Sequence, residues 1–438
     1  MADRVRVVRQ VGSRLIVASR RLRWDRFLNR RSRLIVALGL LGPGLIAANA
    51  GNDAGGIATY ASDGAQYGYG LVWVMVTITV SYVVVQLMAA RLGAVTGKGL
   101  AELIREQYGL RWSVFATSAF VLTNVGIAIS DFIGIGAAMG LAGIPTQVSV
   151  PIAGIVIWLI VVRGSYKIAE RILIALTIPF FAYPVAAILA HPKWGEVVKA
   201  SFTPTIHLNS RYLLLLIATA GTTIAPWMQI YLQSAVVERG VDVDGLRAQR
   251  VEVMSGAIFA DVIAAFIIIA TGATLFRHGI HSIASAADAA KALVPFAGRY
   301  AELLFGVGLL GASVLAAAIL PIATGYAVAE SFGVEKGLSQ RPREAPVFVG
   351  VITAVIAIST IVAIIPGVPV IALLIGVQVI NGALLPVILI FVWRLSRSRE
   401  VLGEHRNGRA FDLLAGATVI WTSALSLTLL VATVTGSV

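Results

Sequence analysis

The first chemistry-bearing feature of the sequence is a carboxylate set in an apolar stretch. Residues 47–59 read AANAGNDAGGIAT, which places Asp53 between Gly51 and Gly55. The surrounding apolar sequence is long enough to cross the hydrocarbon core of a bilayer, where an ionisable side chain usually marks an ion or substrate pathway. Because glycine is a poor helix former, we expect the helix to be interrupted at residues 52–56.

A second interruption is expected between Gly221 and Pro226, in the segment IATAGTTIAPWMQIYLQSAVVERG. A broken helix strands backbone groups that lipid cannot satisfy, so the break must line a cavity within the protein. The freed carbonyls at the end of the first half-helix carry partial negative charge and are hard oxygen ligands for a cation. We therefore expect Asp53 and such carbonyls to form a cation-binding site. The alternative is a structural kink in which Asp53 is paired with an arginine.

The composition places these breaks in membrane-spanning helices. Of the 438 residues, 58% are hydrophobic and 13% are charged, with a mean hydropathy of +0.87, whereas about a quarter of a soluble domain is charged. The apolar runs reach about 20 residues or more, the length that a helix needs to cross a bilayer. The expected fold class is an all-α polytopic membrane protein with eleven helices. They are predicted at residues 34–66, 69–93, 113–139, 146–163, 168–190, 211–237, 250–275, 298–329, 346–365, 369–394 and 412–435.

The basic residues are distributed as membrane topology requires. The net charge is +13, and Arg and Lys gather in residues 1–33 and in alternate loops such as RLSRSREVLGEHRNGR at 394–409. We predict that residues 1–33 form a basic cytosolic arm against anionic lipid, that the N-terminus is cytoplasmic and that the C-terminus is outside. Two longer outside loops, near 191–211 and 277–299, carry some basic residues against this rule. The membrane explains the charge, so no nucleic acid partner is expected.

The spacing of the two breaks predicts an internal repeat. Five spans separate the equivalent interruptions, so two five-helix halves, at 34–190 and 211–394, must insert with opposite orientation, and residues 395–438 add a cytosolic loop and helix 11. Many secondary transporters are built from such inverted repeats and bind their substrate at paired helix breaks near the membrane midplane.

Three strings make the sequence resemble the Nramp family of divalent metal transporters. They are GPGLIAANAGNDAGGIATYASDGAQYGYGLVW at 42–73, QLMAARLGAVTGKGLAELIREQYG at 86–109 and YLQSAVVERG at 231–240. Family members carry similar strings around a metal-binding Asp-Pro-Gly-Asn in helix 1 and a Met-Pro-His in helix 6. The resemblance implies a LeuT-like fold of two inverted five-helix repeats plus one further helix, with helices 1 and 6 broken.

The sequence departs from the family at positions to which the resemblance assigns metal binding. Gly56 replaces the asparagine ligand, Ala225 replaces the methionine, and Trp227 replaces the histidine. A second family histidine is matched by Gln233, where this chain has one extra residue before Tyr231. The resemblance also implies a backbone carbonyl ligand in helix 6 and a glutamine contact in helix 10. The implied metal-site residues are Asp53, Gly56, Thr222, Ala225 and Gln378.

These departures are similar to those of the Nramp-related magnesium transporter subgroup, and the ligand chemistry favours the same ion. A thioether is a soft ligand that prefers transition metals to magnesium, and it is absent at Ala225. Magnesium sheds water reluctantly and is typically bound through one or two carboxylates, so a wider site with Asp53, carbonyls and an amide suits it. If the helix register slips, the sulfur of Met228 would face the site instead.

Other polar side chains in the spans leave alternatives open. Asp131, in AISDFIGIG, matches a helix 3 acid of the family that is tied to proton movement, while Ala128 replaces another; it is either a relay or a structural aspartate near the inner vestibule. Asp261 is expected to make a structural hydrogen bond. The five histidines lie in loops, so no buried metal ligand or proton carrier is expected among them. The residues expected to line the pathway are Trp227, Gln229, Gln233 and Asn381.

The function expected is transport of magnesium, and of manganese as well, driven by membrane potential and without proton coupling. The main alternative is a proton-coupled manganese or iron importer. Sodium-coupled uptake of an organic solute is disfavoured because Asp53 would repel a substrate carboxylate. An enzyme is disfavoured because no histidine, cysteine or second nearby carboxylate is expected at membrane depth. We expect a monomer in the bacterial inner membrane, with the divalent metal as substrate and no cofactor.

Overall fold

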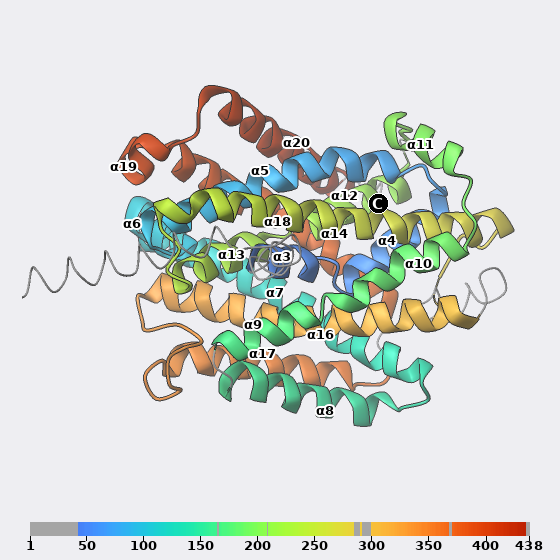
Figure 1. The fold of residues 1–438 in the computed structure, drawn as a ribbon, viewed down its shortest axis with the longest axis horizontal. Helices are drawn as coiled ribbons and strands as arrows, with labels where there is room; N and C mark the ends of the chain where they lie inside the picture. Colours follow the sequence, from blue (N-terminus) through green and yellow to red (C-terminus); the bar gives the residue numbers. More distant parts are fainter. Residues whose placement is uncertain are drawn as a thin grey trace, which may run out of the picture. The chain divides into compact units, whose positions relative to one another are not determined.

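The described residues form helices that lie side by side (Figure 1). The computed structural model describes residues 43–163, 166–207, 209–283, 290, 299–367 and 370–434, so the predicted arm at 1–33 and the start of the first span lie outside the described residues. The principal helices are α3 (Pro43–Ala50), α4 (Ala54–Tyr67), α5 (Val72–Thr96), α6 (Leu100–Tyr108), α7 (Leu110–Leu141), α8 (Thr146–Trp158), α9 (Tyr166–Ala175), α10 (Ala182–Leu189), α11 (Trp194–Phe202), α12 (Ser210–Thr223), α13 (Pro226–Glu238), α14 (Leu246–Thr274), α16 (Arg299–Phe332), α17 (Pro346–Ala363), α18 (Val370–Arg397), α19 (Arg399–Leu402) and α20 (Arg409–Val434).

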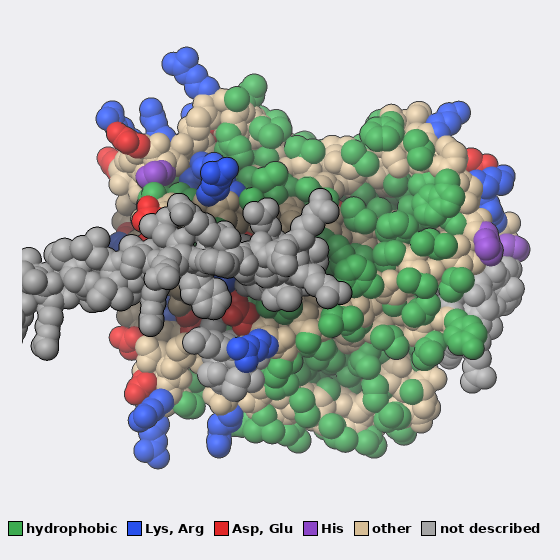
Figure 2. Space-filling view, in the orientation of Figure 1, with side chains coloured by type: hydrophobic (Ala, Val, Ile, Leu, Met, Phe, Trp, Pro, Cys, Tyr) green, Lys and Arg blue, Asp and Glu red, His purple; other side chains and the backbone are tan. Residues whose placement is uncertain are grey.

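The helices have the length and surface of membrane spans. Within the described residues, ten helical segments are long and apolar enough to cross a bilayer. The α3–α4 pair is not among the ten, because each half is too short by itself; with it, the number agrees with the eleven spans expected. Figure 2 shows hydrophobic side chains across the middle of one face and charged side chains toward its two ends. The prediction of an all-α polytopic membrane protein is confirmed.

The fifth predicted span, 168–190, is not one continuous helix. The chain runs through α9, then a short 3-10 turn at Ile178–Phe181, and then α10. Pro179 occupies the first turn of the 3-10 segment, where its missing N–H and fixed φ oppose continuation of an α-helix. This interruption was not predicted from the sequence.

Glycine contacts bring the site-bearing helices together. A Cβ on Gly221 of α12 would stand 2.5 Å from the backbone nitrogen of Gly382 in α18. Only a residue without a side chain permits these two backbones to cross so closely, and the crossing lies two residues before the end of α12. We call the end of the bundle that carries α6 and α19 the α6 end, and the end that carries α11 the α11 end (Figure 1).

Candidate metal-binding site

The first break separates α3 from α4 and presents Asp53. α3 ends at Ala50, Gly51 and Asn52 form a turn, and Asp53 takes an extended conformation as the N-cap of α4. Its Oδ1 accepts a hydrogen bond from the backbone N–H of Gly56 at 2.6 Å, so the carboxylate satisfies one of the unpaired donors at the helix start. The break is shorter than predicted, because Ala54–Gly56 already belong to the helix.

The second break is the Ile224–Ala225 linker between α12 and α13. Ile224 leaves the helical conformation (φ −117°, ψ 59°), Ala225 is extended, and Pro226 opens α13 at its first position. Proline is favoured there because its missing N–H would have no partner in the helix. The break therefore leaves the last carbonyls of α12 and the first N–H groups of α13 without partners within their own helices, as an ion site at paired half-helices requires.

The two breaks meet at Thr222 and Gly51. The Thr222 hydroxyl lies 3.4 Å from the Gly51 carbonyl oxygen, to which it donates. A Cβ on Gly56 would stand 2.7 Å from that hydroxyl, 3.0 Å from the Gly51 carbonyl oxygen and 3.3 Å from Oδ1 of Asp53. The predicted site residues Asp53, Gly56 and Thr222 are thus brought together, and the missing side chain of Gly56 allows the two breaks to touch.

Two amides on α18 connect the breaks. The Nε2 of Gln378 donates to both carboxylate oxygens of Asp53, at 3.0 and 3.2 Å. The Nδ2 of Asn381 donates to the carbonyl oxygen of Gly221 at 2.7 Å and lies 3.4 Å from the Oε1 of Gln378. Gln378 therefore contacts Asp53, and Asn381 lies one turn away from it; their roles at the metal site and along the pathway stay predictions.

A second carboxylate lies at the first break. The Oδ1 of Asp131 on α7 accepts a hydrogen bond from the backbone N–H of Ala54 at 3.0 Å, and its side chain is fully buried. The expectation that no second carboxylate is near Asp53 is therefore wrong, whereas the choice between a relay and a structural role for Asp131 stays a prediction. Gly134 was an available signal: one turn on from Asp131, it leaves α7 without a side chain where it meets Ala54.

The residues at the start of α13 make different contacts. Ala225 is the N-cap and supplies no ligand side chain. Trp227 lines a small cavity between α7, α13 and α18, together with Asn124 and Asn381. Gln229, with its amide oriented to suit its surroundings, donates to the carbonyl oxygens of Ala225 at 2.7 Å and Pro226 at 3.0 Å.

Gln233 lies farther along α13 and is not brought to Asp53. Its Nε2 donates to the carbonyl oxygen of Lys98 at 2.9 Å, in the segment between α5 and α6. Met228, by contrast, packs against the first break: a Cβ on Gly51 would stand 3.4 Å from its sulfur. A thioether therefore faces the break although Ala225 keeps its place at the start of α13, so no register shift is needed.

Two further aspartates are buried in the spans. Asp261 is buried and lies beside Thr79, and its structural role stays a prediction. Asp63, on α4, accepts a hydrogen bond from the Thr219 hydroxyl at 2.6 Å and was not predicted as a site residue. Its spacing from Gly56 and Tyr60 by seven and three residues places all three on one face of α4, the face whose Gly56 and Tyr60 meet Thr222 and Thr223 of α12.

The donor set suits a hard cation. In the part of the chain that the structure describes, no three acidic, histidine or cysteine side chains gather as a metal cluster, and no lysine or arginine pairs with Asp53, which is bonded by Gly56 and Gln378. The alternative of an arginine-paired kink is therefore wrong for these residues. One carboxylate, backbone and hydroxyl oxygens and an amide are ligands that magnesium and manganese accept, and the nearby thioether suits manganese better.

Comparison with known proteins identifies the family. The model for Nramp, described as natural resistance-associated macrophage protein-like, matches residues 44–432. The chain belongs to the Nramp family. It is similar to the divalent metal cation transporter MntH of Pectobacterium carotovorum subsp. carotovorum, with 27% identity over 418 residues, covering 92% of this chain and 96% of that protein. MntH of Erwinia tasmaniensis is 30% identical over 311 residues, covering 69% and 74%.

Solved structures show the same fold. The manganese transporter of Eremococcus coleocola, in complex with an aromatic bis-isothiourea substituted compound, superposes with a TM-score of 0.72 at 21% identity, covering 92% of this chain and 88% of that one. MhsT in complex with L-phenylalanine superposes with a TM-score of 0.59 at 15% identity, covering 89% and 97%. This Nramp chain therefore has the LeuT-like fold and is a multi-pass membrane transporter of divalent metal, not an enzyme.

Proposed function

We propose that the chain transports magnesium, and manganese as well, by alternating access. The observation that carries this proposal is the setting of Asp53, a buried carboxylate held only by a backbone N–H and an amide where two broken helices meet. A carboxylate bonded by neutral groups suits an ion that keeps much of its water. Gly56 and Ala225 add no side-chain ligand, and the implied metal set remains Asp53, Gly56, Thr222, Ala225 and Gln378.

We propose the bacterial inner membrane as the location, with a monomer as the working unit. By the positive-inside rule we expect the N-terminus and the α6 end in the cytoplasm and the C-terminus outside. Membrane potential supplies about 2.3 kcal/mol per elementary charge per 100 mV, or roughly 4.6 kcal/mol for a divalent ion. At about 1.4 kcal/mol per factor of ten, this drives accumulation by about three orders of magnitude.

Transport uncoupled from protons is supported by the residues at the family histidine positions. Trp227 is an indole and Gln233 an amide, and neither titrates near neutral pH. Gln233 is, in addition, engaged by its amide with the backbone of Lys98. Magnesium is abundant, so a passive route down the electrochemical gradient would suffice.

A proton-coupled manganese or iron importer remains the second candidate, because two observations favour it. Asp131 places another titratable group at the same break as Asp53, and the thioether of Met228 packs against Gly51. A proton held on one aspartate while the ion binds the other would couple the two, and the sulfur would favour a softer metal.

The two candidates are separated by uptake into proteoliposomes at clamped potential with a pH-sensitive dye inside. Magnesium, manganese, calcium and iron are compared. The proposal predicts magnesium entry without internal acidification. It also predicts a rate of magnesium uptake that does not change with the internal pH. Acidification that tracks magnesium entry and disappears in Asp131→Asn would establish the second candidate instead. Absence of magnesium entry alongside rapid manganese entry would remove the proposed substrate.

A further inference from the structure

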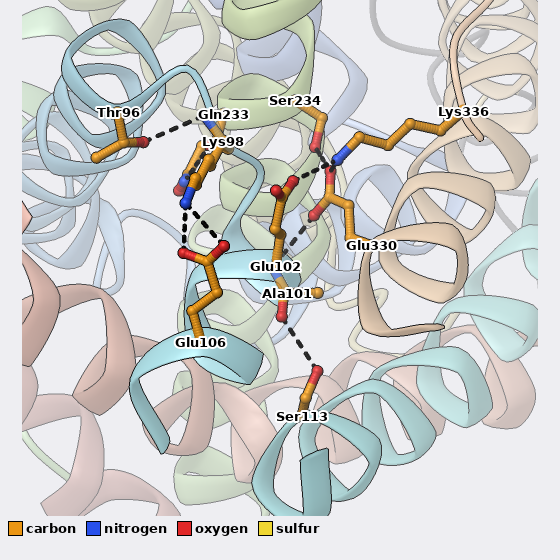
Figure 3. Close-up of polar contacts among 10 residues, drawn as sticks. All are labelled: Thr96, Lys98, Ala101, Glu102, Glu106, Ser113, Gln233, Ser234, Glu330 and Lys336. Atoms are coloured by element: carbon orange, nitrogen blue, oxygen red, sulfur yellow. Dashed lines mark hydrogen bonds and ion pairs between the residues drawn. The ribbon is translucent and has the colours of Figure 1, made fainter. Parts of the chain in front are cut away.

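A buried carboxylate at the α6 end joins three segments that are distant in the sequence (Figure 3). Glu330, near the end of α16, has a fully buried side chain. Its Oε1 accepts a hydrogen bond from the Ser234 hydroxyl of α13 at 2.6 Å, and its Oε2 accepts one from the backbone N–H of Ala101 in α6 at 3.2 Å. The Nζ of Lys336 lies 3.1 Å from Oε1 of Glu330 and 3.1 Å from Oε2 of Glu102.

The start of α6 is shaped to receive this carboxylate. Gly99 is the N-cap of α6 and makes no side-chain cap of its own. A Cβ at Gly99 would collide with the carboxylate of Glu330. A carboxylate at a helix N-terminus satisfies unpaired N–H groups and is stabilised by the helix dipole. The helix α6 thus takes its cap from α16, so its position depends on Glu330.

The same end of α13 makes two more contacts that hold it in place. Gln233 donates to the Lys98 carbonyl oxygen at 2.9 Å, next to the start of α6. Glu238 accepts from the backbone N–H of Ser339 at 3.0 Å and from the hydroxyl of Tyr326 on α16. The opposite end of α13 begins at the non-helical break described above. Because that break separates α13 from α12, α13 is able to tilt as one body when these contacts at the α6 end are released.

We propose that Glu330 is a positioning residue for transport, which holds α13 against α6 and α16 in the state closed at the α6 end. Opening the metal site toward that end requires Ser234 to leave Glu330. Lys336 is partly exposed and stays beside the carboxylate, so the released Glu330 keeps a counter-charge and opening does not strand a buried charge. The inference rests on the proposed alternating-access function.

The chain contains no cysteine, so single-cysteine reporters need no prior substitutions. Ala116→Cys places an inner reporter in the small cavity that Trp227 lines, and Thr219→Cys places an outer reporter on α12, where it faces α4. A membrane-impermeant maleimide is applied from the cytoplasmic side for the first and from the outside for the second. Labelling rates are compared between the protein with Glu330 in place and the Glu330→Gln variant. The substitution removes the charge that Ser234 and Lys336 contact.

We expect Glu330→Gln to raise the labelling rate of the inner reporter by about tenfold, as loss of a charge-assisted hydrogen bond in the closed state predicts. The outer reporter should label no faster than before, because opening one end closes the other. Ser234→Ala should raise inner labelling less. The matched control is Glu102→Gln, which removes the other partner of Lys336 but keeps the bonds to Ser234 and Ala101, and it should leave labelling within about twofold.

Three outcomes would overturn the proposal: equal inner labelling in the wild type, Glu330→Gln and Ser234→Ala; a rise in both reporters, which indicates general loosening; or a rise in Glu102→Gln as large as in Glu330→Gln. If Glu330→Gln fails to fold, Ser234→Ala decides, since it removes only a hydroxyl. The readout needs no transported ion, so a failure of the proposed magnesium transport leaves this test interpretable.

Discussion

Buried carboxylates in the middle of the bundle differ from those at the α6 end in their partners. Asp53 and Asp131 are bonded by backbone N–H groups and the Gln378 amide. At the α6 end, Glu330 lies beside Lys336, and Glu252 of α14 accepts a hydrogen bond from Arg239 at 3.2 Å. The carboxylates at the α6 end therefore have basic partners within the chain. Those in the middle of the bundle are bonded by neutral donors.

The difference indicates which acids are structural. A buried carboxylate with a basic partner contributes to folding only as part of its pair, and Glu252 behaves in this way: its Oε1 also accepts from the backbone N–H of Gly44 at 2.8 Å, at the start of α3. Asp53 and Asp131 instead depend on the N-terminus of α4, whose partial positive charge is smaller than that of a full cation. The remaining negative charge is available to a divalent ion.

The largest effect is expected from removing the charge of Asp53. Asp53→Asn retains an oxygen that is able to accept from Gly56 but removes the charge. We expect uptake of magnesium and manganese in proteoliposomes to fall to background, because Asp53 is the carboxylate that Gln378 contacts where the two breaks meet, whereas the nearby Asp131 is bonded to the backbone N–H of Ala54. The melting temperature in detergent should stay within a few degrees of the wild type, which separates loss of binding from loss of fold. Uptake at near wild-type rates would remove Asp53 from the site.

Changing the neutral part of the site should alter the choice of ion. In Gly56→Asn with Ala225→Met, the new side chains add an amide and a thioether and narrow the space near Thr222, since even a Cβ at 56 would stand 2.7 Å from its hydroxyl. We expect magnesium transport to fall by about tenfold or more, while manganese binding holds or tightens. Magnesium transport that is untouched by both changes would show that ligand softness and space do not set selectivity here.

Charge pairing at the α6 end should appear in stability. Glu252→Gln removes the charge that Arg239 contacts, while Arg239 keeps a longer contact with Glu170 at 3.6 Å. We expect a loss of about 2 kcal/mol in the free energy of unfolding, the range of a partly buried charge-assisted hydrogen bond, seen as a lower melting temperature. Lys193→Ala breaks an exposed pair with Glu196 and should change stability by no more than about 0.5 kcal/mol. Equal effects of the two substitutions would contradict the account.

The smallest effect expected concerns the thioether beside the first break. Met228→Leu preserves volume but removes sulfur. If the sulfur contacts the ion, the dissociation constant for manganese should rise by about three- to tenfold, and that for magnesium should change less, since magnesium gains little from a soft ligand. Titrations with both ions on the purified variant measure this. Parallel changes for both ions would assign Met228 to packing alone.

Much of the fold was predictable because its determinants are local. Apolar length fixes a span, and glycine, asparagine and proline mark a break, so both interruptions were found within a few residues. The end of the first break was misplaced because Asp53 caps α4 and allows Gly55 and Gly56 to enter the helix. The break in the fifth span was missed, although Pro179 marks it.

The neighbours of Asp53 were less predictable because they depend on packing between distant helices. Gln378 and Thr222 were identified only through the family resemblance. The position of Asp131 beside the first break was not predicted, since nothing in its own sequence states which helix faces it; the missing side chain of Gly134 was the local sign of close contact with Ala54. The contacts of Glu330 were not predicted, because its partners come from three separate segments.

The central claim, that Asp53 takes its counter-charge from the transported ion, is tested most directly by calorimetric titration of magnesium into purified protein. The wild type, Asp53→Asn and Glu252→Gln are compared in the same detergent and at the same pH. The account predicts one binding event in the wild type, none in Asp53→Asn, and an affinity within about threefold of the wild type in Glu252→Gln, whose acid is already paired by Arg239. Binding of magnesium to Asp53→Asn with wild-type affinity would contradict it.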